Sequence, residues 1–167
     1  MHMPSRFAAL GLLAASLISL PACAGSGASQ DITKMLEVTS VKTGWWDVGV
    51  EDGKNKIVPT VILTLKNVSD QPINLVSLNA VVRRSGETEE WGGAYVKLLG
   101  SEELPPGASP KPVVLRSNLG YTGTEPRAQM LKHKLFLDAN FEVFVKHGGE
   151  QWVKLGAWPV ARELLTQ

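Results

Sequence analysis

The chain has 167 residues, with 17 basic and 16 acidic side chains and a formal net charge of +1. A charge this close to balance argues against a nucleic-acid-binding protein, which would carry a clear basic excess. Beyond its N-terminal segments the chain keeps roughly 135 residues, enough for one hydrophobic core and not for two. The single cysteine, Cys23, excludes an internal disulfide and a cysteine-based metal cluster.

The N-terminal segment has the pattern of a bacterial lipoprotein signal. An apolar run over residues 7–20 follows the basic Arg6 and is too short for a permanent membrane span. It ends in Leu20-Pro21-Ala22-Cys23, which resembles the lipoprotein motif in which the cysteine becomes the mature N-terminus. The resemblance implies a signal peptide over residues 1–22 and a diacylated Cys23 that anchors the protein in a membrane. The alternative is ordinary secretion, which leaves a free cysteine.

Residues 23–34 are expected to form the lipidated cysteine and a flexible tether, because residues 24–30 are rich in Gly, Ser and Ala, and residues 31–34 read as a short helical lead-in. Ala24 is not the aspartate that retains enteric lipoproteins in the inner membrane. By that resemblance we expect the outer membrane, with the domain of residues 35–167 facing the periplasm.

The first half of that domain alternates apolar and polar residues, which predicts strands. Residues 36–42 read as a strand, and residues 43–50 as either its continuation or a loop. Asp52-Gly53 predicts a hairpin turn. Two strands within residues 60–84, joined by a polar turn, are expected to form a core hairpin or the corner of a sandwich.

The second half continues the pattern, with one exception. We expect strands near residues 94–98 and 113–117, separated by a proline-rich loop, and a last hairpin from residues 141–146 and 152–158. Residues 119–135 are the one helical candidate, with Thr124 as a cap and Pro126 in the first turn. The sequence therefore predicts an all-β, antiparallel β-sandwich of about seven strands with one short helix.

Two turn motifs add a family resemblance. The turn Leu-Lys-Asn-Val-Ser-Asp-Gln-Pro-Ile, with Asn67 at its start, and the corner Leu-Pro-Pro-Gly at Leu104 resemble the immunoglobulin-like β-sandwich domains of bacterial envelope proteins, of the FxLYD and DUF4352-like type. The Phe-x-Leu-Tyr-Asp signature itself is absent. The resemblance implies a binding or structural module with no catalytic residues.

Catalytic and metal-binding patterns are sparse. His133 lies between two lysines and His147 before two glycines, so both read as surface residues. The acidic residues 87, 89 and 90 lack the spacing of a calcium loop and are better explained as a solvated turn. No Gly-x-Ser-x-Gly turn is present. We therefore expect no enzyme activity, no metal and no cofactor.

The aromatic residues are the best candidates for a binding site. Trp45 and Trp46 are adjacent, so on a strand they face opposite sides and only one belongs to the core. The exposed one, with Trp91, Tyr95 and Tyr121, would form a platform for a sugar, a peptide or a lipid. The alternative is that the tryptophans, Trp152 and Trp158 among them, fill the core.

A second candidate site is cationic. Arg116 begins a segment, residues 116–124, that is rich in glycine and hydrogen-bonding side chains and suits an anionic group. A plain loop explains the same residues. Three functions are compatible with these features. We favour a non-catalytic, lipid-anchored adaptor for an envelope protein or a glycan. The alternatives are a carrier of a small apolar ligand such as a lipid, and a hydrolase. The small number of histidines disfavours the last.

Overall fold

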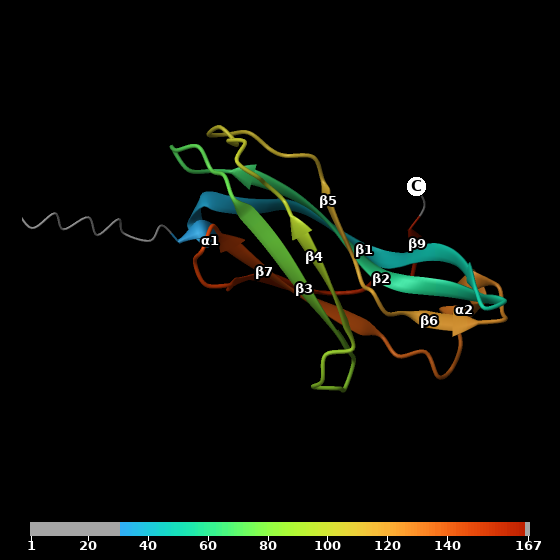
Figure 1. The fold of residues 1–167 in the computed structure, drawn as a ribbon. Coiled ribbons are helices and arrows are strands. Elements are labelled where there is room, and N and C mark those ends of the chain that lie inside the picture. Colours follow the sequence, from blue (N-terminus) through green and yellow to red (C-terminus); the bar gives the residue numbers. More distant parts are fainter. Residues whose placement is uncertain (1–30, 166–167) are drawn as a thin grey trace, which may run out of the picture.

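The structure is a computed structural model that describes residues 31–165. Two β-sheets of five and four strands pack as a sandwich, and two short helices lie at its ends (Figure 1). The predicted all-β sandwich is thereby confirmed. The predicted signal peptide, Cys23 and most of the predicted tether lie outside the described residues.

The first sheet is organised around a long hairpin. Its strands are β1 (Leu36–Glu51), β2 (Lys54–Asn67), β5 (Val113–Arg116), β6 (Tyr121–Gly123) and β9 (Leu164–Leu165). Their order is β5-β2-β1-β9, with β6 also pairing β2, and only the pairing of β9 with β1 is parallel.

The ambiguous residues 43–50 are strand, so β1 runs unbroken for 16 residues. At its end Asp52 and Gly53 have φ of 50° and 74°, the left-handed backbone of a tight hairpin turn. The Asp-Gly prediction is therefore confirmed. Register shifts between Val38 and Ser40 and between Asp47 and Gly49 bend the ribbon along its length.

The second sheet comprises β3 (Val76–Arg84), β4 (Gly92–Lys97), β7 (Ala139–His147) and β8 (Val153–Pro159), in the order β4-β3-β7-β8, all antiparallel. The predicted last hairpin is confirmed as β7 and β8. The core hairpin that residues 60–84 were expected to form is wrong, because β2 and β3 lie in different sheets. This stretch is the corner of the sandwich, where the chain crosses from one sheet to the other.

The core is filled by the inward rows of the central strands. Val61, Leu63 and Leu65 of β2 are at most 1% exposed. They face alternate residues of β3 and β7, of which Leu78, Ala80, Val82, Phe141, Val143 and Val145 are equally buried. Period-two alternation thus places one apolar row from each sheet in the interior.

Asn67 joins the two motifs on which the family resemblance rests. Its buried side-chain amide donates to the carbonyls of Gln71 (2.8 Å) and Leu104 (3.0 Å), and its Oδ1 accepts from the Ser69 backbone N–H (3.0 Å). Its backbone carbonyl accepts from the Gly107 N–H at 2.8 Å. An asparagine fits here because it supplies two donors and an acceptor on one short side chain.

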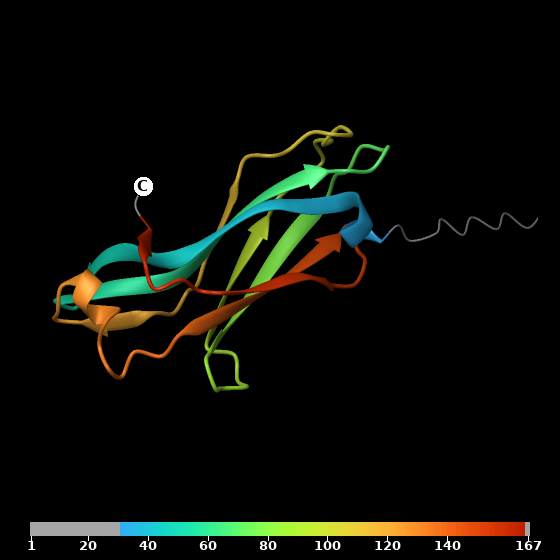
Figure 2. The ribbon, with the colours of Figure 1, turned by 180° about the vertical axis from the view of Figure 1, so that it is seen from behind.

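The helix expected over residues 119–135 is wrong. The segment begins with β6 and contains only α2 (Arg127–Met130). Gly120 lies so close to β2 that a Cβ there would be 2.1 Å from the Ile57 carbonyl oxygen. The segment therefore follows β2 as a strand, and its remainder lies under the end of the β1–β2 hairpin (Figure 2), where Met130, Leu131 and Phe136 are buried.

At the other end of the sandwich lies α1 (Ile32–Met35), capped by a hydrogen bond from the Thr33 N–H to the Asp31 carboxylate. Ile32 is 1% exposed and belongs to the core. Ile32, which was expected to belong to the tether, therefore packs with the folded domain. No helix in the described part of the chain has the length and apolar character needed to cross a membrane.

Candidate partner-binding surface

Four aromatic rings form a cluster beneath the end of the β1–β2 hairpin. Trp45 is fully buried, with its ring centroid 4.7 Å from Phe136, 5.6 Å from Tyr121 and 6.5 Å from Trp91. Tyr121 lies 5.0 Å from Trp91 and 4.8 Å from Phe136. The Trp45 indole N–H has no hydrogen-bond partner among the described residues, so packing alone holds this ring.

Trp45 is therefore a core residue and Trp46, on the opposite face, is partly exposed, as the alternation predicted. Trp91 and Tyr121 are half-buried against Trp45. Burial raises the pKa of the Tyr121 phenol above its usual value. Phe136 completes the cluster, and sequence reasoning missed it because it comes directly after the segment expected to be helical and stands in no alternating pattern.

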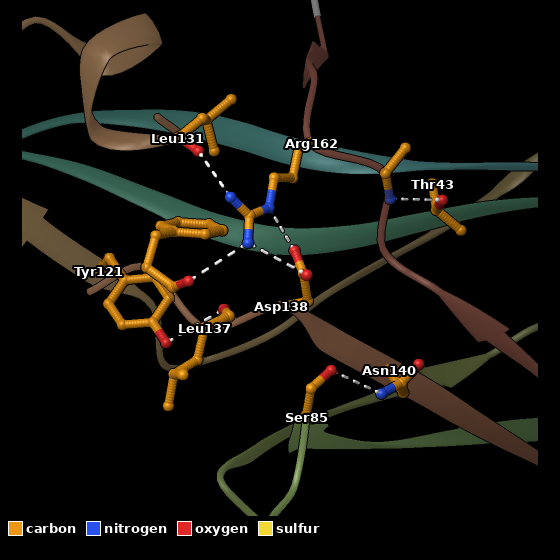
Figure 3. Close-up of polar contacts among 10 residues, drawn as sticks. Thr43, Ser85, Tyr121, Leu131, Leu137, Asp138, Asn140 and Arg162 are labelled. Atoms are coloured by element: carbon orange, nitrogen blue, oxygen red, sulfur yellow. Dashed lines mark hydrogen bonds and ion pairs between the residues drawn. The ribbon is translucent and has the colours of Figure 1, made fainter. Parts of the chain in front are cut away.

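Polar contacts hold the loop that closes this cluster (Figure 3). The Arg162 guanidinium donates to the Asp138 carboxylate (Nε–Oδ1 2.5 Å) and to the carbonyls of Phe136 (3.3 Å) and Leu131 (3.4 Å). The Tyr121 hydroxyl donates to the Leu137 carbonyl at 3.3 Å. One arginine thus ties the C-terminal segment to residues 131–138.

Beside the cluster lies a cleft of about 300 Å³, whose lining includes Tyr121, Met130, His133, Leu135 and Phe136. It opens at the end of the sandwich, under β6 and α2. The Nδ1 atom of His133 accepts a hydrogen bond from the Leu135 backbone N–H at 3.2 Å. This contact gives His133 a local structural role.

Arg116 and Trp46 form a separate unit on the outer face of the first sheet. The Arg116 guanidinium lies 3.7 Å from the centroid of the Trp46 ring, a close cation–π contact. Register pairs Trp46 with Val58 and Arg116 with Thr60, so all four side chains share this face. The stack helps to keep Thr60 fully buried and Val58 nearly so, although they point away from the core.

Tyr95 lies on the outer face of the second sheet. Its ring is 62% exposed and stands edge-on to Trp152 at 6.4 Å between centroids, and Trp152 is 39% exposed. The Lys146 ammonium lies 5.0 Å from the Trp152 centroid, and the Tyr95 hydroxyl is 3.1 Å from Ser77 Oγ. The alternative reading of Trp152 as a core residue is therefore wrong, whereas the partly buried Trp158 packs against the core.

A charged network borders this outer face. Glu142 of β7 pairs with Arg83 and with Lys154, whose Nζ lies 2.6 Å from Glu142 Oε1. The hydrogen bond from Lys154 lowers the pKa of the Glu142 carboxyl, and Arg83 adds to the effect. Two cations thus hold one carboxylate in place on the outer face of the second sheet.

The candidate residues thus fall into three places rather than one platform. Trp45, Trp91 and Tyr121 belong to the aromatic cluster, Trp46 and Arg116 to the outer face of the first sheet, and Tyr95 to the outer face of the second. Among the described residues no group of three His, Cys, Asp or Glu side chains is placed to hold a metal ion.

Comparisons with known proteins assign the chain to no family. No family model and no curated protein matches the chain. Among solved structures, the chain is similar to the X-ray structure of a Northeast Structural Genomics Consortium target, at 14% identity and a TM-score of 0.45, over 78% of this chain and 89% of that one. The resemblance to FxLYD-type domains stays a prediction.

Proposed function

We propose that the protein is a non-catalytic binding module of the bacterial cell envelope, which presents its exposed sheet surface to a protein or a glycan. The observation that carries this proposal is the aromatic pair Tyr95 and Trp152 on the outer face of the second sheet. Large aromatic rings exposed on a surface are typical of binding sites. No other layer covers that face in the described part of the chain.

The finer fold assignment belongs to the same proposal. We propose that the sandwich is immunoglobulin-like, because β1, β2 and β5 share one sheet while β3, β4, β7 and β8 share the other. The contact between the turn at Asn67 and the corner at Leu104 supports it, since these are the motifs of the envelope domains that the sequence resembles.

Anchoring through an acylated Cys23, in the outer membrane and facing the periplasm, completes the proposal. It rests on the lipoprotein-like signal at Leu20 to Cys23. Metabolic labelling with a palmitate analogue tests it, because Cys23→Ala must lose the label. An unlabelled wild-type protein would refute the anchor while leaving the binding module in place.

The binding proposal is tested by affinity purification of the full-length protein from its own host. We expect one envelope component to co-purify, to be depleted by Trp152→Ala and Tyr95→Ala, and to persist in Val50→Ala, which truncates an exposed side chain at the hairpin tip. Equal recovery with all three variants would show that this face is not the binding surface.

The carrier of a small apolar ligand remains a second candidate because of the cleft beside Tyr121 and Met130. If lipid rather than protein or glycan is extracted from the purified protein, and Met130→Lys abolishes its retention, the carrier takes first place. Leu135→Lys is the matched control, because Leu135 lines the same cleft but is exposed, so this variant should retain the lipid.

A further inference from the structure

The outer edge of β4 borders the proposed binding face, and no strand of the described chain pairs with it. β4 ends the second sheet and pairs only with β3, and β5 ends the first sheet and pairs only with β2. The two strands lie side by side at one flank of the sandwich (Figures 1 and 2). In the described part of the chain no strand pairs with either outer edge.

The register fixes which backbone groups point to that edge. The Leu98 N–H donates to the Val76 carbonyl (2.9 Å), so the even-numbered residues of β4 point their backbone N–H and C=O groups toward β3. In an antiparallel pair, alternate residues point their N–H and C=O groups away from the partner. Tyr95 and Lys97 therefore direct their backbone groups outward, away from β3.

Gly93 shows that this edge accepts a partner. Its N–H donates to Asn118 Oδ1 (2.9 Å), and its carbonyl accepts from the Asn118 N–H (3.1 Å). Asn118 thus occupies the first outward position of β4 as a neighbouring strand would. Beyond it the contact ends, and the next outward residue, Tyr95, has no strand beside it.

A groove continues from this point. It has a volume of about 560 Å³ and is lined by Gly93 to Val96 of β4 and by Val114, Arg116 and Asn118. Val114 is 38% exposed. The groove therefore offers a row of backbone donors and acceptors, one apolar side chain and one guanidinium, which together suit an extended peptide.

The charges beside the groove select the kind of peptide. Neither Arg116 nor Lys97 has an ion-pair partner in the described part of the chain. The Arg116 guanidinium is held over Trp46 rather than by a carboxylate, so it remains available to an acid. Extended segments that carry acidic side chains match this edge.

We propose that the β4 edge binds an extended, acidic segment of another protein, which adds a strand to the second sheet by bonding the backbone of Tyr95 and Lys97. This inference rests on the proposed binding function and narrows its partner to a protein. Main-chain bonds supply the register, while Val114 and Arg116 select alternate side chains of the segment.

The first test uses hydrogen exchange of the full-length protein, followed by NMR. The probe is a synthetic peptide of about eight residues that alternates valine with glutamate, the period of a strand. We expect peptide binding to slow exchange of the Tyr95 and Lys97 amides by about tenfold or more, since each amide gains a hydrogen bond. The Val96 amide faces β3 and is the internal control.

Variants separate backbone pairing from side-chain contact. Tyr95→Pro removes the ring and an outward N–H, a backbone change that edge strands tolerate, and should bind the peptide about tenfold more weakly than Tyr95→Thr. Tyr95→Thr loses the same ring but keeps the N–H, so the difference between the two variants reports the backbone bond alone. A peptide N-methylated at alternate amides gives the same test without altering the protein.

Four results would overturn the inference. They are no binding of the peptide, binding that N-methylation leaves unchanged, binding that protects neither outward amide, and equal binding when glutamine replaces glutamate. If both amides are already protected without peptide and the protein sediments as a dimer, the occupant is a second copy of the chain. Capture of an envelope component that depends on Trp152 would leave the proposed function standing in each case.

Discussion

Asn67 is the residue whose replacement tests the structure most directly. Asn67→Ala removes two donated bonds, to Gln71 and Leu104, and two accepted ones, from the N–H and the hydroxyl of Ser69. Each such bond contributes about 0.5–1.5 kcal/mol net, so we expect a loss of about 2–4 kcal/mol in the free energy of unfolding. The carbonyls of Gln71 and Leu104 keep one other donor each, which limits the loss.

That loss is a large fraction of the roughly 5–15 kcal/mol that stabilises an ordinary domain. For a domain of this size it corresponds to a fall of roughly 7–14 °C in the melting temperature. Thermal and urea unfolding followed by circular dichroism measure it. Asn140→Ala is the matched control, because Asn140 is exposed and its side chain makes one long bond, 3.3 Å, to Ser85.

Asn67→Asp sharpens the test by keeping the size of the side chain. The new carboxyl group faces the Gln71 and Leu104 carbonyl oxygens, which disfavours its ionised form and raises its pKa in the folded state. A raised pKa gives stability that is present at low pH and is lost as pH rises through that value. We expect the deficit relative to wild type to shrink as pH falls toward ~4 and to be smallest below that value. A deficit that is absent or independent of pH would refute the assigned bonds.

Three further predictions concern the end of the sandwich. Trp45→Ala should lower the free energy of unfolding by about 3–5 kcal/mol in urea titrations, because the ring is fully buried. Trp46→Ala, on the exposed face, should lower it much less. Similar losses from the two variants would contradict the assignment of faces. Gly120→Ala should be destabilising in the same assay, since its Cβ meets the Ile57 carbonyl at 2.1 Å, while Gly149→Ala, where nothing lies within 4 Å, should be neutral. For Tyr121 the raised pKa gives stability that is complete below the unfolded value of 10.0 and is lost above it. Above about pH 10 the melting temperature of wild type should therefore fall more steeply than that of Tyr121→Phe. Parallel curves would show that Tyr121 is not buried enough to matter.

The sequence alone determined the elements whose signals are local. Alternation in residues 60–66, 76–84 and 141–146 predicts strands because side chains on a strand point to opposite sides, whatever the strand pairs with. Asp52-Gly53 predicts its hairpin because the turn needs two residues that tolerate positive φ. For the candidate site, the same alternation predicted that the side chains of Trp45 and Trp46 point to opposite sides of the strand.

Only the tertiary structure decided which strands pair and which face is buried. Residues 60–84 hold two good strands in either arrangement. Their assignment to different sheets depends on pairing with β1, which comes just before them, and with β7, which lies far along the chain. Residues 119–135 have helical spacing, but pairing of Tyr121 with Ile57 and close contact at Gly120 override that preference. Likewise, Trp91, Tyr95 and Tyr121 read alike as exposed aromatic residues. Their separation into a buried cluster and an open face follows from packing between distant segments, which no local pattern encodes.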